Sequence, residues 1–193
     1  MVDSKTPQQI LYIVKESLNA RGASTIRSLG RAFRSIDSYN GDRKIDKEEF
    51  YVGLKEYGAD ISKKEAEVLL DYLDTDKDGF VNYDEFLVGI RGKPNAKRQT
   101  FIDKAYFKFD KDGDGRITAA DLRGVYDCSS HPKVQSGEMC EEEVYVKFLQ
   151  NFGDKNRDGT ISRDEWNDYY AAVSSSIDND DHFITLMITA WRL

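Results

Sequence analysis

The chain has 193 residues and a formal net charge of −7, with 39% hydrophobic and 33% charged residues. This composition predicts a globular, soluble protein of one ordinary domain or two small lobes, and it excludes a disordered chain. The acidic balance argues against nucleic-acid binding, which needs a basic face, and no apolar run approaches the roughly 20 residues needed to span a membrane.

The first predicted element is an amphipathic helix over residues 7–20. Apolar side chains recur there with helical spacing, and the pattern closes before Gly22. A further helix start is predicted at Ser62, which stands three residues before Glu65 and just ahead of an apolar run. Both helices are expected to pack one apolar face on a core.

A short acidic pattern then recurs along the chain. It consists of an Asp, an Asp or Asn two residues later, a further Asp, a Gly, a hydrophobic residue and finally an acid. Copies begin at Asp74, Asp110 and Asp154, and an irregular copy lies at residues 37–49. The pattern is typical of the EF-hand calcium-binding loop. We number the copies loop 1 (residues 37–49), loop 2 (74–85), loop 3 (110–121) and loop 4 (154–165).

The repeat predicts the fold. In EF-hands, the hydrophobic residue at the eighth loop position bridges two loops as a short antiparallel strand. These residues are Ile45, Val81, Ile117 and Ile161. We therefore predict an all-α protein with two EF-hand lobes, made of four paired helix-loop-helix units with extra N- and C-terminal helices. The lobes are residues 1–91 and 100–193. The linker is 92–99, where Gly and Pro break the helix within a basic stretch.

Two segments outside the loops carry further expectations. The helix after loop 3 is predicted to present Leu122, Val125 and Tyr126 on one face. The tail, residues 179–193, is too apolar to be left in water and should pack on its own lobe or on a fixed neighbour. Cys128 and Cys140 flank His131 at a spacing that matches no usual zinc pattern, so we expect free thiols in place of zinc or a disulfide.

Loops 2 and 4 carry complete ligand sets. Calcium takes six to eight oxygens, which a 12-residue loop supplies from positions 1, 3, 5, 7, 9 and 12, with Gly at position 6 for the sharp turn. The predicted ligands of loop 2 are Asp74, Asp76, Asp78, the Phe80 carbonyl, Asn82 and Glu85. Those of loop 4 are Asp154, Asn156, Asp158, the Thr160 carbonyl, Ser162 and Glu165, with Gly153 inserted ahead of the loop.

Loop 3 differs at its last position. Its predicted ligands are Asp110, Asp112, Asp114, the Arg116 carbonyl, Thr118 and Asp121. The Asp121 side chain is one methylene shorter than Glu, so capture of the ion by both carboxylate oxygens is harder. Mg²⁺, which prefers a smaller octahedral shell, therefore competes with Ca²⁺ at this loop.

Loop 1 has two alternative registers. Counting back from Ile45 puts Ser38 first and Arg43 where Gly is usual, whereas counting forward from the preceding helix puts Asp37 first and adds one residue. Asp37, Asn40, Asp42, Asp46 and Glu49 could gather around an ion. We expect loop 1 to serve as a structural partner for loop 2 without a tight site.

The chain as a whole resembles the calcyphosin family from about residue 8 onward. The strongest marker is the insertion at residues 131–134 (His-Pro-Lys-Val) and 136–138 (Ser-Gly-Glu), which lengthens the gap between loops 3 and 4. Residues 21–24, 121–126, 151–152, 168–170 and 190–193 add to it. The resemblance implies two EF-hand lobes, calcium binding, a signalling role and an association with ciliated cells.

Three functions remain open: a calcium sensor, a constitutive structural component such as one of a cilium, and a calcium buffer. A sensor would engage a protein partner through an apolar lobe surface. The chain has only three Met, which argues against the Met-rich grooves of promiscuous sensors. We expect no enzymatic activity, no membrane anchor, a monomer, and a cytoplasmic or ciliary location, because no catalytic motif, signal peptide or myristoylation glycine is present.

Overall fold

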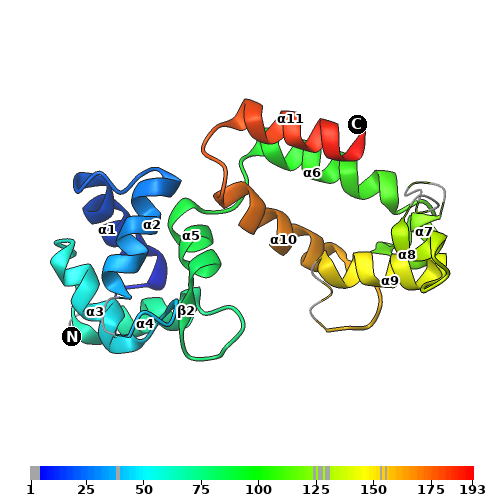
Figure 1. Cartoon of the computed structure of the whole chain (residues 1–193). Helices are drawn as coiled ribbons and strands as arrows, with labels where there is room; N and C mark the ends of the chain where they lie inside the picture. The colour runs from blue at the N-terminus through cyan, green and yellow to red at the C-terminus, as the bar shows by residue number, and fades with distance from the viewer. Residues whose placement is uncertain are drawn as a thin grey trace. The chain divides into compact units, whose positions relative to one another are not determined.

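The computed structural model describes residues 5–37, 40–123, 125, 128, 131–152, 154 and 156–193. The chain divides into two compact units (Figure 1). Unit 1 comprises the chain up to Lys93 together with Ser175–Asp178, and unit 2 comprises Pro94–Ser174 together with Asn179–Leu193. Within the described chain, no helix has both the length and the apolar character needed to cross a membrane.

Unit 1 contains two helix-loop-helix motifs preceded by one extra helix. Its elements are α1 (Pro7–Ala20), α2 (Ile26–Ile36), β1 (Lys44–Ile45), α3 (Lys47–Glu56), α4 (Lys63–Leu73), β2 (Val81–Asn82) and α5 (Tyr83–Arg91). The helix predicted over residues 7–20 is confirmed. The capping box at Ser62 is confirmed as well, because its hydroxyl accepts the Glu65 N–H while its own N–H donates to the Glu65 carboxylate.

The eighth-position residues pair as predicted. In unit 1, β1 and β2 are antiparallel and place Ile45 opposite Val81. In unit 2, β3 (Arg116–Ile117) and β4 (Ile161–Ser162) place Ile117 opposite Ile161. All four side chains are buried. Each pair of loops is therefore fixed back to back by two backbone strands and one apolar contact.

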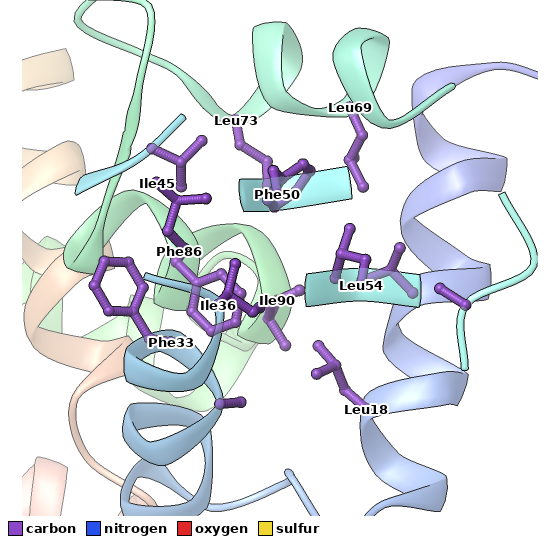
Figure 2. Close-up of a cluster of buried hydrophobic side chains, with 14 of the residues drawn as sticks. Leu18, Phe33, Ile36, Ile45, Phe50, Leu54, Leu69, Leu73, Phe86 and Ile90 are labelled. Atoms are coloured by element: carbon purple, nitrogen blue, oxygen red, sulfur yellow. The ribbon is translucent and has the colours of Figure 1, made fainter. Parts of the chain in front are cut away.

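The core of unit 1 lies between the helices that flank loops 1 and 2. Phe33, Ile36, Phe50, Leu73 and Phe86 are all buried there (Figure 2). The extra helix α1 closes this core, because Ile10, Val14 and Leu18 are inaccessible to solvent and α1 packs on α4 and α5. Figure 2 shows Leu18 directed toward Leu54 from the α1 side. A helix of the same unit, α1, thus covers the apolar face of the lobe.

Unit 2 repeats the plan with a closing helix. Its elements are α6 (Ala96–Phe109), β3, α7 (Ala119–Leu122), α8 (Pro132–Gln135), α9 (Glu141–Asn151), β4, α10 (Arg163–Ser175) and α11 (Asp180–Trp191). The predicted all-α fold in two lobes with extra terminal helices is confirmed. Cys128 and Cys140 form no disulfide; Cys128 is buried and Cys140 is exposed.

Helix α11 packs on its own unit alongside α6 (Figure 1), so the tail packs as predicted. At its N-terminal end, the buried Arg98 of α6 donates from Nε to Asp180 at 2.6 Å and from a guanidinium N–H to the Ser174 carbonyl at 2.6 Å. At its C-terminal end, the Lys108 ammonium donates to the carbonyls of Trp191 and Arg192. A cation at the carboxyl end of a helix also complements the helix dipole.

Residues 96–99 of the predicted linker 92–99 are helical, because Asn95 caps α6. One local prediction was wrong. The helix after loop 3 ends at Leu122, since Arg123 adopts an extended backbone with φ −60° and ψ 121°. Val125 therefore lies in a turn, and Tyr126 lies outside the described residues.

The packing of α1 generates a stability prediction. Replacing Leu18 with Ala should lower the free energy of unfolding by about 2–5 kcal/mol, since it leaves a cavity in a closed core. Tyr12 lies on the outer face of the same helix and is 66% exposed, so Tyr12→Ala should change stability by less than about 0.5 kcal/mol. Urea unfolding followed by far-UV circular dichroism measures both. Equal effects would contradict the place of α1 in the core.

Candidate metal centres

Loops 2, 3 and 4 each turn through two residues of positive φ. These are Lys77 and Gly79 in loop 2, Gly113 and Gly115 in loop 3, and Arg157 and Gly159 in loop 4. The residue at the sixth position is Gly in all three, because this left-handed conformation costs Gly nothing. The turn wraps the chain around the first-position aspartate and points backbone N–H groups at it.

The acidic side chains of loop 2 converge. Carboxylate oxygens of Asp74, Asp76 and Asp78 lie within 4.8 Å of one another. Asp74 is only 4% exposed. Its Oδ2 accepts the Gly79 N–H at 3.0 Å, while its Oδ1 is buried with no hydrogen-bond partner among the described residues. A buried carboxylate oxygen without a partner is costly, so this atom marks where a cation would bind.

The twelfth-position Glu85 already reaches back over the start of loop 2. Its Oε1 accepts the N–H and the hydroxyl of Thr75, at 2.7 and 2.8 Å, and its Oε2 accepts the Asn82 N–H at 3.0 Å. Asn82 in turn caps α5 by accepting the Glu85 N–H at 3.0 Å. The ninth-position side chain thus both caps the exit helix and positions the carboxylate.

Loop 3 has the same plan with a shorter final arm. Oxygens of Asp110, Asp112 and Asp114 converge within 4.8 Å, and Asp110 Oδ1 is buried without a partner among the described residues. Asp121 Oδ1 lies 3.4 Å from the Lys111 N–H, against 2.7 Å for the matching Glu85 contact in loop 2. The missing methylene therefore sets the carboxylate back from the loop.

In loop 4, the first-position aspartate is hydrogen-bonded through both of its carboxylate oxygens. Both oxygens of Asp154 accept loop N–H groups: Oδ1 from Asp158 and Oδ2 from Gly159, each at 3.0 Å. Asn156 also donates to Asp158, at 3.0 Å. In contrast to Asp74 and Asp110, Asp154 has no oxygen left without a partner. Each oxygen keeps a second lone pair, so a cation binding here would share Asp154 with these N–H donors. Gly153 lies outside the described residues.

The remaining predicted ligands lie where the strands and helices meet. Thr118 and Ser162 accept the N–H of the twelfth-position residue, as Asn82 does. Of the seventh-position residues, predicted to offer carbonyls, Arg116 begins β3, and Phe80 and Thr160 directly precede β2 and β4. Convergence of carboxylates is thus seen for the first, third and fifth positions of loops 2 and 3.

Electrostatics within loop 2 favour a cation. Burial and the neighbouring carboxylates of Glu85, Asp78 and Asp74 raise the pKa of Asp76. A divalent ion would remove this repulsion. Asp78 behaves differently, because the Lys44 ammonium of loop 1 donates to it and lowers its pKa.

Sequence reasoning missed this cross-loop contact. Unit 2 repeats it in weaker form, with Arg116 lying 3.7 Å from Asp158. The signal was present in the sequence: a basic residue occupies the seventh position of loops 1 and 3. Strand pairing sets Lys44 opposite Asn82, and from there its ammonium reaches Asp78, the fifth-position aspartate of loop 2.

Comparison with known proteins places the chain in a family. A family model described as an EF-hand domain pair matches residues 26–91 and 99–171. The chain belongs to the EF-hand calcium-binding family. The match covers all four EF-hand loops and therefore includes the irregular first one.

Relatives of this EF-hand chain include proteins from two crustaceans and from Arabidopsis thaliana. Crustacean calcium-binding protein 23 of Faxonius limosus is 33% identical over 190 residues, covering 97% of this chain and 93% of the relative. The protein of the same name from Homarus americanus is 29% identical over 156 residues, with 80% and 90% covered. Calcium-binding protein CML37 of Arabidopsis thaliana is 30% identical over 156 residues, with 79% and 80% covered.

The geometry of loop 2 predicts how its affinity depends on Glu85. Glu85→Gln keeps the length of the closing arm but replaces one carboxylate oxygen with an amide NH2, so calcium affinity at loop 2 should fall by at least tenfold, or about 1.4 kcal/mol. The neighbouring Asp84 is exposed, and Asp84→Asn should change the affinity by less than about fivefold. Isothermal titration calorimetry measures both. An equal loss in the two variants would indicate a general charge effect.

The Lys44 contact predicts a gain of affinity. Lys44→Gln frees Asp78 and removes a positive charge beside loop 2, so calcium affinity there should rise, by no more than about fivefold because the pair is exposed. The gain should shrink at high salt. Lys47→Gln serves as the control, since Lys47 pairs with Asp71 outside the loop. An unchanged or weaker affinity in Lys44→Gln would contradict this role.

Proposed function

We propose that this protein is a calcium sensor or adaptor, in which ions at loops 2, 3 and 4 rearrange the helices and permit a protein partner to bind. The proposed ligands are those predicted from the sequence, with Mg²⁺ competing at loop 3. The observation that carries the proposal is the position of Trp191, which contacts the helix before loop 3 and the helices on both sides of loop 4.

Trp191 contacts aromatic side chains next to both loops of unit 2. Its ring lies 5.0 Å from Phe109, the last residue before loop 3, and 5.4 Å from Phe152, which ends α9 ahead of loop 4. Its indole N–H donates to the Tyr170 hydroxyl of α10 at 2.6 Å. Any change in the angles between α6, α9 and α10 must therefore alter the contacts of Trp191.

This arrangement couples the loops to the closing helix. Only Phe183 and Met187 of α11 are buried among its apolar residues, whereas Leu186 and Ile188 are 38% and 40% exposed. The helix is thus held by a narrow apolar stripe and its two polar ends. We infer that opening of the lobe weakens the contacts that hold α11 on unit 2. A partner helix would compete with α11 for the same apolar surface.

The alternative is a structural component or a buffer, and one observation favours it. Both lobes already cover their apolar faces, with α1 in unit 1 and α11 in unit 2. Burial of Ile10, Val14 and Leu18 stabilises the covered state of the first lobe. If calcium does not overcome that stabilisation, the ions support the fold without exposing a surface.

Further features of the proposal rest on the sequence. The small number of Met favours a narrow set of protein partners, and the acidic charge disfavours nucleic acid. We also propose the calcyphosin-like character, a monomeric state, a lack of catalytic activity and a cytoplasmic or ciliary location. The relatives named above are calcium-binding proteins by name, which supports the calcium chemistry and leaves the partner to experiment.

Fluorescence of the dye ANS during calcium titration in millimolar Mg²⁺ tests the sensor proposal. We expect a sharp rise in the micromolar range, because sensor sites bind at about 10⁻⁷–10⁻⁵ M and opening exposes apolar surface. The triple variant Glu85→Gln, Asp121→Asn, Glu165→Gln should show no rise in that range. Calcium binding to the wild-type protein without any change in ANS fluorescence would overturn the sensor proposal in favour of a buffer or structural component.

A further inference from the structure

The two helix-loop-helix motifs of unit 1 share a close contact between helices. In each motif, the last residue before the loop lies against a glycine of the helix that follows the loop. Ile36 ends α2 and faces Gly53 of α3, and Leu73 ends α4 and faces Gly89 of α5. Each glycine stands four residues after the twelfth-position acid of its loop. Both Ile36 and Leu73 are buried, so the two contacts lie within the core of the lobe (Figure 2).

The register of loop 1 makes the two contacts equivalent. Asp37 Oδ2 accepts the Arg43 N–H at 3.0 Å, and the first-position aspartate of loop 2 accepts the matching N–H at the same distance. Asp37 is thus the first-position residue. Ile36 therefore directly precedes loop 1, as Leu73 directly precedes loop 2. Ser38, the alternative first residue, lies outside the described residues.

A side chain at either glycine would collide with the residue that it faces. A Cβ atom at Gly53 would lie 2.7 Å from Cγ1, 2.8 Å from Cγ2 and 2.9 Å from Cβ of Ile36. A Cβ atom at Gly89 would lie 2.3 Å from Cδ2 of Leu73 and 3.4 Å from its Cδ1 and Cγ. Carbon atoms in contact lie about 3.5–4.0 Å apart. The close approach of the helices therefore depends on the absence of a side chain at both positions.

The two collisions differ in how they could be relieved. At Gly89, the nearest atom is the end of the Leu73 side chain, which can turn into another rotamer. At Gly53, the atoms are the Cβ and both branches of Ile36. A β-branched side chain is stiff at χ1, and its Cβ moves only with the backbone. A methyl group at Gly53 would therefore be accommodated chiefly by separation of α2 from α3.

Unit 2 has larger side chains at the matching positions. Tyr169 stands four residues after the twelfth-position acid of loop 4, and its ring stacks on that of Phe152 with the centres 4.2 Å apart. Val125 holds the matching position after loop 3, where α7 has already ended. Within the part of the chain that the structure describes, the contact of a pre-loop residue with a glycine therefore belongs to unit 1.

We propose that Gly53 is a positioning residue for the calcium response of unit 1, because the space beside it lets α2 close onto α3. The inference rests on the proposed function, since only a lobe that opens with calcium has a closed state whose stability affects binding. A methyl group at Gly53 destabilises this closed state and favours separation of the two helices before calcium binds.

Two contacts transmit this separation to loop 2. The strands β1 and β2 join loops 1 and 2, and Phe33 of α2 packs on Phe86 of α5 with the ring centres 5.6 Å apart. A ligand binds more tightly when the state that binds it is already populated. Destabilising the closed state at Gly53 therefore raises the calcium affinity of loop 2.

A calcium titration of the full-length protein followed by amide NMR measures this affinity, because the Gly79 N–H donates to Asp74 within loop 2. We expect Gly53→Ala to raise the affinity about threefold or more, and to raise ANS fluorescence in the absence of calcium. Gly89→Ala is the matched control, since it makes the same change at the equivalent position of a helix. Because Leu73 can turn aside, the affinity in this control should change by less than about twofold.

Ile36 supplies a second variant. Ile36→Ala removes the branches that the new methyl group would meet, so adding Gly53→Ala to it should leave the calcium affinity unchanged. Ile36→Ala alone weakens the same contact and should itself raise the affinity. This variant keeps the proposal testable if Gly53→Ala does not fold.

A lower free energy of unfolding for Gly53→Ala without a gain in calcium affinity would refute the proposal, because the glycine would then serve the fold alone. If ANS fluorescence of the wild-type protein still rises with calcium in that case, the sensor proposal stands and only this inference fails. If calcium binds to the wild-type protein without a change in ANS fluorescence, and Gly53→Ala binds it with wild-type affinity, both fail.

Discussion

The crowding of carboxylates within short loops is the constraint on which the rest of the structure depends. In loop 2, three acidic side chains lie within 4.8 Å of one another, and burial raises the pKa of Asp76. Like charges at this separation repel, so the loop must be held by other means. The N–H groups around Asp74, the cap at Asn82 and the paired strands supply that support. A cation that neutralises the carboxylates therefore acts on the helix ends as well as on the loop.

The two loops of a lobe share more than a strand pair. Ile45 and Val81 join the loops of unit 1 through backbone and apolar contacts, and Lys44 extends from one loop to a carboxylate of the other. A change of charge in one loop consequently alters the electrostatic potential at the neighbouring loop. The extra helices then decide what this coupling can accomplish, because α1 and α11 occupy the apolar faces that helix rearrangement would otherwise expose.

Much of the fold could be predicted because its signals are local. The spacing of acids, the sixth-position Gly and the eighth-position apolar residue define a loop without knowledge of distant contacts, and the periodicity over residues 7–20 defines α1. Features that depend on neighbours could not be predicted. The spacing of Leu122 and Val125 fits a helix, yet the backbone of Arg123 ends it. The sequence left two registers for loop 1, and only the hydrogen bond from Arg43 to Asp37 selects one. Whether a first-position aspartate keeps an oxygen free, as Asp74 does and Asp154 does not, depends on the exact closure of each loop.

The aromatic composition of the two lobes has an optical consequence. Both tryptophans of the chain, Trp166 and Trp191, belong to unit 2, where their ring centres lie 6.2 Å apart. Unit 1 contains Tyr and Phe but no Trp. Excitation at a wavelength that only indole absorbs therefore produces emission from the second lobe only. The tryptophan emission spectrum of the intact protein contains no fluorophore of the first lobe. The chain thus carries an intrinsic probe that assigns a spectroscopic change to one half of the molecule without any label.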